Sequence, residues 1–179
     1  MPFLVAAVVL FSAIATLNLV LTLAVIRRLR ESPPAARKVA ADPDLPELPA
    51  GSPVPAFHAE ALSGRSVSDK SQSESEAVYA FFDSGCSSCR PTIPRLLDYA
   101  KRNGLNPDQV VAVVGGEAAD AGEYVDALDG RATVILEETL GPVAAAFSIH
   151  SFPAFVIADP GGIVRRSGDS TSTLVAAAA

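Results

Sequence analysis

Three short runs of apolar residues, many of them β-branched or aromatic, constrain the fold of this chain more than any other feature. They are residues 77–82 (AVYAFF), 109–116 (QVVAVVGG) and 132–136 (ATVIL), each of strand length. Continuous runs of this kind are typical of strands buried on both faces, since a half-exposed strand alternates apolar and polar residues. We therefore expect a central sheet with helices on both sides.

The segments between and after these runs complete an α/β pattern. The expected ranges are helices 87–102, 117–128 and 141–149, strands 154–158 and 163–168, and a final helix 170–179. Strands that alternate with helices indicate one sheet covered on both faces. Before the sheet we expect a short hairpin with Phe57 and Leu62 on one side, a Ser63-Gly64 turn and then Val67.

The N-terminal part of the chain is apolar over residues 3–26 and contains no Asp, Glu, Lys or Arg before Arg27. About 20 apolar residues are enough for a helix to cross a bilayer, so we expect residues 1–27 to be a transmembrane anchor. A cleaved signal peptide is the alternative, but its basic n-region is missing here. Residues 28–53 are rich in proline and predict a tether, which leaves residues 54–179 as the folded domain.

The charge of the chain limits its partners. With 14 Lys+Arg against 20 Asp+Glu it is acidic overall. Nucleic-acid-binding domains have a basic face, so nucleic acid is not an expected partner. Basic residues do gather directly after the apolar segment, at Arg27, Arg28, Arg30, Arg37 and Lys38. By the positive-inside rule, these residues place the domain in the cytoplasm.

The only two cysteines, Cys86 and Cys89, lie where the first buried strand gives way to the first expected helix. A helix N-terminus favours an anion, so a thiol there has its pKa lowered from about 8.5 to roughly 3.5–7.5. Cys89 would lie one turn further along the helix, close enough to attack a mixed disulfide at Cys86. The spacing predicts a redox pair in which Cys86 attacks and Cys89 resolves.

Three other interpretations of this pair are weaker. A structural zinc site takes four ligands, and only His58 and His150 are available besides the cysteines, so we expect no metal and no cofactor. A structural disulfide across so short a loop restricts the unfolded chain little. Two inert buried thiols are the third possibility.

Three segments together resemble membrane-anchored thioredoxin-like proteins of the TlpA/ResA group, and especially the MauD type. The segment FFDSGCSSCRPTIPRL (81–96) resembles their active-site segment, and HSFPAFVIADPGGIV (150–164) their second signature. The segment LPAGSPVPAF (48–57) resembles the start of redoxin domains. The resemblance implies a thioredoxin fold with an N-terminal β-hairpin extension, preceded by one transmembrane helix. It also implies an extracytoplasmic domain, whereas the basic residues after the apolar segment predict a cytoplasmic one. Of these two sides we expect the extracytoplasmic side.

The resemblance implies roles for particular residues. Pro153 would be a cis-proline facing Cys86, and the backbone of Phe152 would pair with an extended substrate segment. Pro94 matches the proline that bends the active-site helix in this family.

Other positions depart from thioredoxin itself. Gly85 replaces an aromatic residue before the first cysteine, and Ala80 replaces a buried acid. Asp83 is near enough to the pair to substitute in part for that acid, or to cap the helix.

The resulting hypothesis is a membrane-anchored thiol–disulfide oxidoreductase, of the protein disulfide reductase or isomerase type. Its partners would be protein thiols and disulfides, together with an electron-exchange partner that the sequence does not identify. Peroxidase activity is not expected, because Asp83 and Tyr79 occupy the positions of the Thr and Pro of peroxiredoxins. The alternative function is a thioredoxin-like binding or metal-delivery module for a maturation partner, with little turnover.

Overall fold

The structure of the chain is a computed structural model that describes residues 48–72 and 75–175, together with residues 16 and 18. The chain divides into two compact units, residues 1–45 and 46–179. Apart from residues 16 and 18, the predicted anchor (1–27) lies outside the described residues, as does most of the tether (28–53). Among the residues that are described, no helix has the length and apolar character needed to cross a bilayer.

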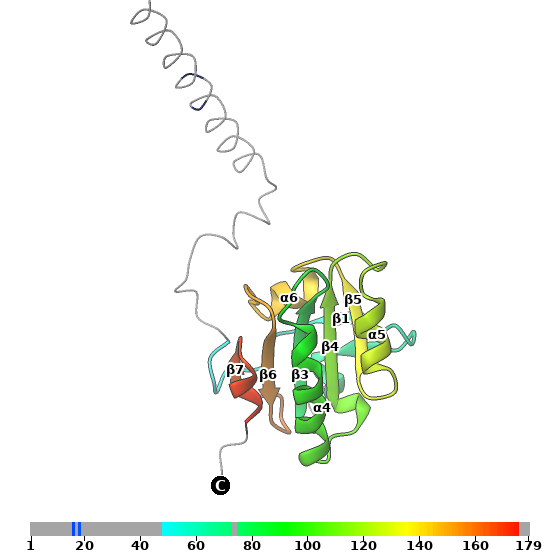
Figure 1. The fold of residues 1–179 in the computed structure, drawn as a ribbon. Coiled ribbons are helices and arrows are strands. Elements are labelled where there is room, and N and C mark those ends of the chain that lie inside the picture. Colours follow the sequence, from blue (N-terminus) through cyan, green and yellow to red (C-terminus); the bar gives the residue numbers. More distant parts are fainter. Residues whose placement is uncertain (1–15, 17, 19–47, 73–74, 176–179) are drawn as a thin grey trace, which may run out of the picture. The chain divides into compact units, whose positions relative to one another are not determined.

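The folded unit contains a five-stranded mixed sheet in the order β5-β4-β3-β6-β7, and a separate hairpin β1-β2 (Figure 1). Strands β3, β4 and β5 are parallel, whereas β6 and β7 run antiparallel to their neighbours. The strands are β1 (His58–Glu60), β2 (Ser66–Ser68), β3 (Ala77–Asp83), β4 (Val110–Gly115), β5 (Thr133–Glu137), β6 (Ala154–Ala158) and β7 (Val164–Gly168). The helices, with η for 3₁₀, are α3 (Asp69–Gln72), η1 (Arg90–Thr92), α4 (Ile93–Arg102), η2 (Pro107–Gln109), α5 (Gly122–Leu128), α6 (Pro142–Ala146) and η3 (Thr171–Leu174).

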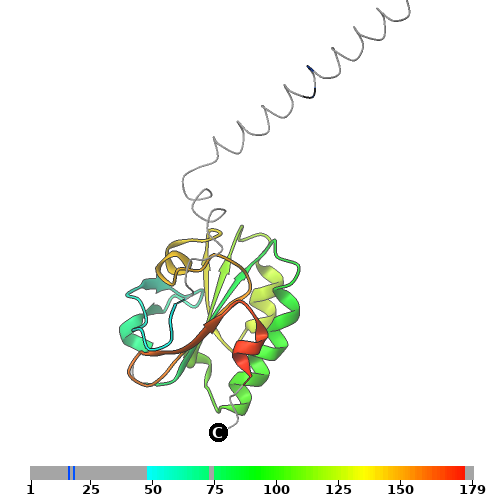
Figure 2. The ribbon, with the colours of Figure 1, turned by 90° about the vertical axis from the view of Figure 1, so that its left-hand side faces the viewer.

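Both faces of the sheet are covered, as the sequence predicts. Helices α4, α5 and η3 lie on one face, and helix α6 with the β1-β2 hairpin lies on the other (Figure 2). Successive side chains of a strand point to opposite faces, so β3 supplies two separate cores. Ala80 and Phe82 belong to the core under α4 and α5, and Tyr79 and Phe81 belong to the core under α6.

Phe147, directly after α6, is the centre of an aromatic cluster on the second of these faces. It is fully buried, and its ring centroid lies 5.5 Å from that of Phe57, 4.8 Å from Tyr79 and 5.1 Å from Phe81. Aromatic pairs at these distances stabilise a core beyond the area that they bury. Phe147 therefore joins the segment before the hairpin, the central strand and the chain after α6.

The first predicted helix, 87–102, was wrong at its N-terminal end. The α-helix begins at Ile93, and a 3₁₀ helix over Arg90–Thr92 precedes it. Pro91 and Pro94 explain the difference, because each lacks the N–H that would bond four residues back. The two prolines therefore disfavour regular α-helix over residues 87–92.

Other elements are also shorter than predicted or differ in type. Helix α5 begins at Gly122 rather than 117, and the predicted final helix is a 3₁₀ helix over Thr171–Leu174, with residues 176–179 outside the described part. The hairpin is present, but Leu62 is 56% exposed while Phe57 is buried, so the two do not share one buried side. The helix expected over 141–149 is α6, which begins at Pro142 and ends at Ala146.

The segment before the hairpin adds to the sheet edge at β7. The Gly51 N–H donates to the Val164 carbonyl (2.7 Å), the Val164 N–H donates to the Ser52 carbonyl (2.8 Å), and the Ser167 hydroxyl donates to the Leu48 carbonyl (2.6 Å). These bonds occupy groups that an edge strand otherwise exposes. The packed chain thus begins before the predicted boundary at residue 54.

Replacing Phe147→Ala should lower the free energy of unfolding by about 3–5 kcal/mol, because it removes a buried ring from the aromatic cluster. Urea denaturation of the full chain in detergent, followed by circular dichroism, measures this change. Leu62→Ala is the control and should change stability by less than about 0.5 kcal/mol, since the side chain is exposed. Equal effects of the two substitutions would contradict the assignment of Phe147 to the core.

Candidate active site

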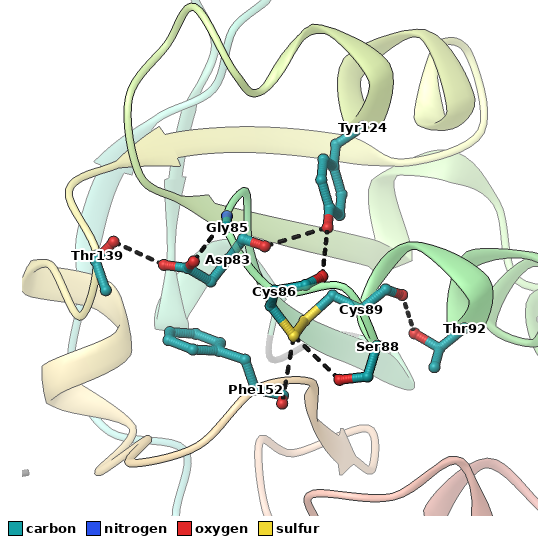
Figure 3. The surroundings of a disulfide bond; sticks show 9 residues. All are labelled: Asp83, Gly85, Cys86, Ser88, Cys89, Thr92, Tyr124, Thr139 and Phe152. Carbon is teal, nitrogen blue, oxygen red and sulfur yellow. Dashed lines mark hydrogen bonds between the residues drawn. A yellow bond between two sulfur atoms is a disulfide. The ribbon is translucent and has the colours of Figure 1, made fainter. Parts of the chain in front are cut away.

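Cys86 and Cys89 form a disulfide directly after strand β3, with their Cα atoms 5.5 Å apart (Figure 3). The two residues differ in exposure: Cys86 is half-buried, whereas Cys89 is 0% exposed and belongs to the core under α4 and α5. Another protein can therefore reach Cys86 but not Cys89. This asymmetry agrees with the roles that the sequence predicts for the two thiols.

The backbone around the pair is a series of turns. The Cys86 N–H donates to the Asp83 carbonyl (3.0 Å), the Cys89 N–H to the Cys86 carbonyl (3.2 Å), and the Thr92 N–H to the Cys89 carbonyl (2.9 Å). Cys86 thus precedes a run of turns and a 3₁₀ helix, not an α-helix as predicted. Groups close to its sulfur therefore matter more for its chemistry than the dipole of α4, which falls off within a turn of the helix end.

Two groups contact the Cys86 sulfur. Its Sγ lies 3.2 Å from the Ser88 hydroxyl and 3.6 Å from the Phe152 carbonyl oxygen. A disulfide sulfur has no proton, so the Ser88 hydroxyl is the donor in the first pair. In the reduced protein the same hydroxyl is placed to donate to a thiolate, which favours the charged form.

The Phe152–Pro153 peptide bond is cis, as the family resemblance implies. Pro153 is buried at the start of β6, and Phe152 is half-buried and packs against both cores. The structure brings the Phe152 backbone to Cys86, although 66 positions separate the two residues.

Asp83 organises the loop that precedes the pair. Its carboxylate accepts from the Gly85 N–H (2.9 Å) and from the Thr139 hydroxyl (2.6 Å). The predicted helix-capping role of Asp83 is wrong, since the N-cap residues of η1 and α4 are Cys89 and Thr92. Asp83 instead closes a turn and links β3 to the loop after β5.

The remaining predicted positions lie around this loop. Gly85 is exposed, and a Cβ there would lie 3.2 Å from the Asp83 carboxylate. Pro94 is the second residue of α4 and is exposed, so it lies in the first turn of this helix. Ala80 is fully buried under α4 and α5, so the position of thioredoxin's buried acid has no titratable side chain here.

Tyr124 is the functional candidate that sequence reasoning missed. It comes from α5, is 3% exposed, and its hydroxyl lies 3.1 Å from the Asp83 carbonyl and 3.3 Å from the Cys86 carbonyl (Figure 3). Burial raises the pKa of Tyr124, and the negative charge of Asp83 raises it further, so the hydroxyl stays a donor at neutral pH. No local pattern predicts a contact between residues 38 positions apart.

Within the described ranges, no three His, Cys, Asp or Glu side chains come together as metal ligands. His58 and His150, the two histidines that the sequence makes available, are both exposed.

Comparison with solved structures decides the fold. The thioredoxin domain of a thiol–disulfide oxidoreductase from Bacteroides vulgatus aligns with a TM-score of 0.59 and 24% identity, over 71% of this chain and 93% of that one. A thiol:disulfide interchange protein from Bacteroides sp. gives 0.58 and 24%, over 72% and 87%. A secreted Mycobacterium tuberculosis disulfide oxidoreductase, homologous to E. coli DsbE, gives 0.53 and 22%, over 64% and 83%.

This chain has a thioredoxin-like fold. The predicted fold class is thereby confirmed for the described domain, and the Cys-x-x-Cys pair lies at disulfide distance within it. No family model matches the sequence, and no curated protein matches it.

Replacing Ser88→Ala should raise the thiol pKa of Cys86 by about half a unit to one unit, because the thiolate loses a hydrogen-bond donor. Titration of the thiolate absorbance in the reduced full chain measures the shift. Ser87→Ala is the matched control, since Ser87 is exposed and its hydroxyl has no hydrogen-bond partner in the described part of the chain. Equal Cys86 pKa values in the two variants would contradict a role of Ser88 in stabilising the thiolate.

Proposed function

We propose that this chain is a membrane-anchored thiol–disulfide oxidoreductase that acts on proteins, with Cys86 as the attacking thiol and Cys89 as the resolving thiol. The observation that carries the proposal is the unequal exposure of the two sulfurs, half-buried at Cys86 and fully buried at Cys89. A mixed disulfide with a protein requires an accessible sulfur. Its resolution requires a second thiol that is near but not competing for the substrate.

The reaction follows from this arrangement. The Cys86 thiolate attacks one sulfur of a substrate disulfide, which forms a Cys86–substrate disulfide and releases the other substrate sulfur as a thiolate. The Cys89 thiolate then attacks Cys86, forming the Cys86–Cys89 disulfide and releasing the second substrate sulfur. Two electrons pass from the pair to the substrate, which takes up two protons as its thiolates become thiols. In the reverse direction the pair oxidises a substrate dithiol.

Substrate binding is assigned to the backbone at Phe152 and Pro153. A substrate cysteine joined to Cys86 would have its own backbone beside Phe152, since the Phe152 carbonyl is 3.6 Å from the Cys86 sulfur. Pairing between extended backbones needs no particular side chain, so it suits an enzyme that accepts several proteins.

The anchor and the side of the membrane are part of the proposal. The apolar residues 3–26 support a single membrane span, and the family resemblance supports an extracytoplasmic domain, where disulfides persist. A membrane-impermeant thiol reagent, applied to intact cells after mild reduction, should then label Cys86 without lysis. Labelling only after lysis would place the domain in the cytoplasm, as the basic residues after residue 26 suggest.

The variant Cys89→Ser should accumulate mixed disulfides between Cys86 and protein substrates, because the resolving step is blocked. Non-reducing gel electrophoresis of the full chain, isolated from cells after acid quenching, detects these as bands that disappear on reduction. Cys86→Ser is the control and should trap nothing. If the two variants trap equally little, the chain acts as a binding module and not as an oxidoreductase.

A further inference from the structure

The hydroxyl of Tyr124 lies on the backbone side of Cys86, opposite the sulfur. Figure 3 shows the tyrosine reaching the loop from one side, while the sulfur points toward Phe152 and Ser88 on the other. The two carbonyls near the hydroxyl belong to Asp83 and Cys86, at 3.1 Å and 3.3 Å. The first accepts the N–H of Cys86 and the second is its own carbonyl. One hydroxyl thus lies within hydrogen-bond distance of two carbonyls of the turn that contains the attacking residue.

This hydroxyl also occupies the place of a helical hydrogen bond. In an α-helix through the pair, the Arg90 N–H would donate to the Cys86 carbonyl, four residues back. Here the Cys86 carbonyl accepts instead from the Cys89 N–H (3.2 Å), three residues on, and the Tyr124 hydroxyl lies 3.3 Å from the same carbonyl. A side chain inserted into the i→i−4 ladder opens or bends a helix at that point. Together with Pro91 and Pro94, this insertion keeps the cysteine segment as turns.

We propose that Tyr124 is a positioning residue for Cys86, whose hydroxyl completes the hydrogen bonds of the opened turn and keeps the thiolate favoured. The catalytic role of Tyr124 rests on the proposed function. Its geometry follows from the contacts of the hydroxyl with the Asp83 and Cys86 carbonyls. The two carbonyl oxygens are negative dipole ends beside the attacking residue. A hydroxyl proton donated to either carbonyl reduces the repulsion between that carbonyl and a thiolate, so the charged form of Cys86 becomes easier to form.

Charged groups near the hydroxyl come from three elements. Asp83 at the end of β3 and Glu123 in α5 are negative, and Arg90 in η1 is positive and forms an ion pair with Glu123. The charges of Arg90 and Glu123 offset one another, and the Asp83 carboxylate is bound by Gly85 and Thr139. The Tyr124 hydroxyl is uncharged. Replacing Tyr124 by Phe therefore removes the donor to the Cys86 carbonyl without changing the net charge.

The test is Tyr124→Phe in a Cys89→Ser background, where Cys86 is the single thiol of the full chain. We expect the Cys86 thiol pKa to rise by about half a unit, and its reaction with a small aromatic disulfide at neutral pH to slow about twofold or more. Tyr99→Phe is the matched control. Tyr99 is also 3% exposed and belongs to the same core, but its hydroxyl donates to Glu76 (3.3 Å), away from the cysteines.

The two tyrosine variants separate positioning from simple stabilisation. If both lose stability and neither changes the Cys86 pKa, Tyr124 is a structural residue and the proposal is overturned. If Cys89→Ser traps no protein but Tyr124→Phe still raises the pKa, the proposed function fails and the positioning role stands.

Discussion

The structure depends on the burial of one strand, β3, on both faces and along both edges. It is paired in parallel with β4 and antiparallel with β6, and its alternating side chains enter the two cores on opposite sides of the sheet. The position of the cysteine loop follows from that of β3, because the loop begins where this strand ends, at one end of the sheet. Because β3 is paired along both edges and buried on both faces, it is a rigid support for the loop that carries the reactive sulfur.

The active site is built by contacts between loops and helices that lie far apart in the chain. Asp83 bonds to Thr139 beyond β5, and Tyr124 in α5 reaches the carbonyls of Asp83 and Cys86. The Phe152 backbone closes the site on the sulfur side. Each contact ties a different segment to the cysteine loop, so the position of Cys86 is determined by the whole carboxyl end of the parallel strands.

Differences between the predicted and the observed elements have local causes. The helix expected over 87–102 rested on the helical spacing of Leu96, Leu97 and Ala100, but Pro91 and Pro94 remove two donors, and the α-helix begins at Ile93. At the C-terminus the Ser170 side chain caps the last helical element by accepting from the Ser172 N–H. The element that it begins is a 3₁₀ helix, whose Leu174 fills the core under α4. Capping starts a helix, but packing determines its length and type.

The sequence by itself determined the α/β pattern, the five strands of the sheet, the cysteine pair and its connection to the first buried strand. These features depend on periodicity and on residues that are neighbours in the chain, which a linear reading can detect. Only the tertiary structure decided the unequal exposure of Cys86 and Cys89, the actual role of the Asp83 carboxylate, and the participation of Tyr124 and Thr139. Those properties arise from contacts across 38 to 66 positions, and the physical reason is that burial and hydrogen bonding are set by packing in space rather than by spacing along the chain.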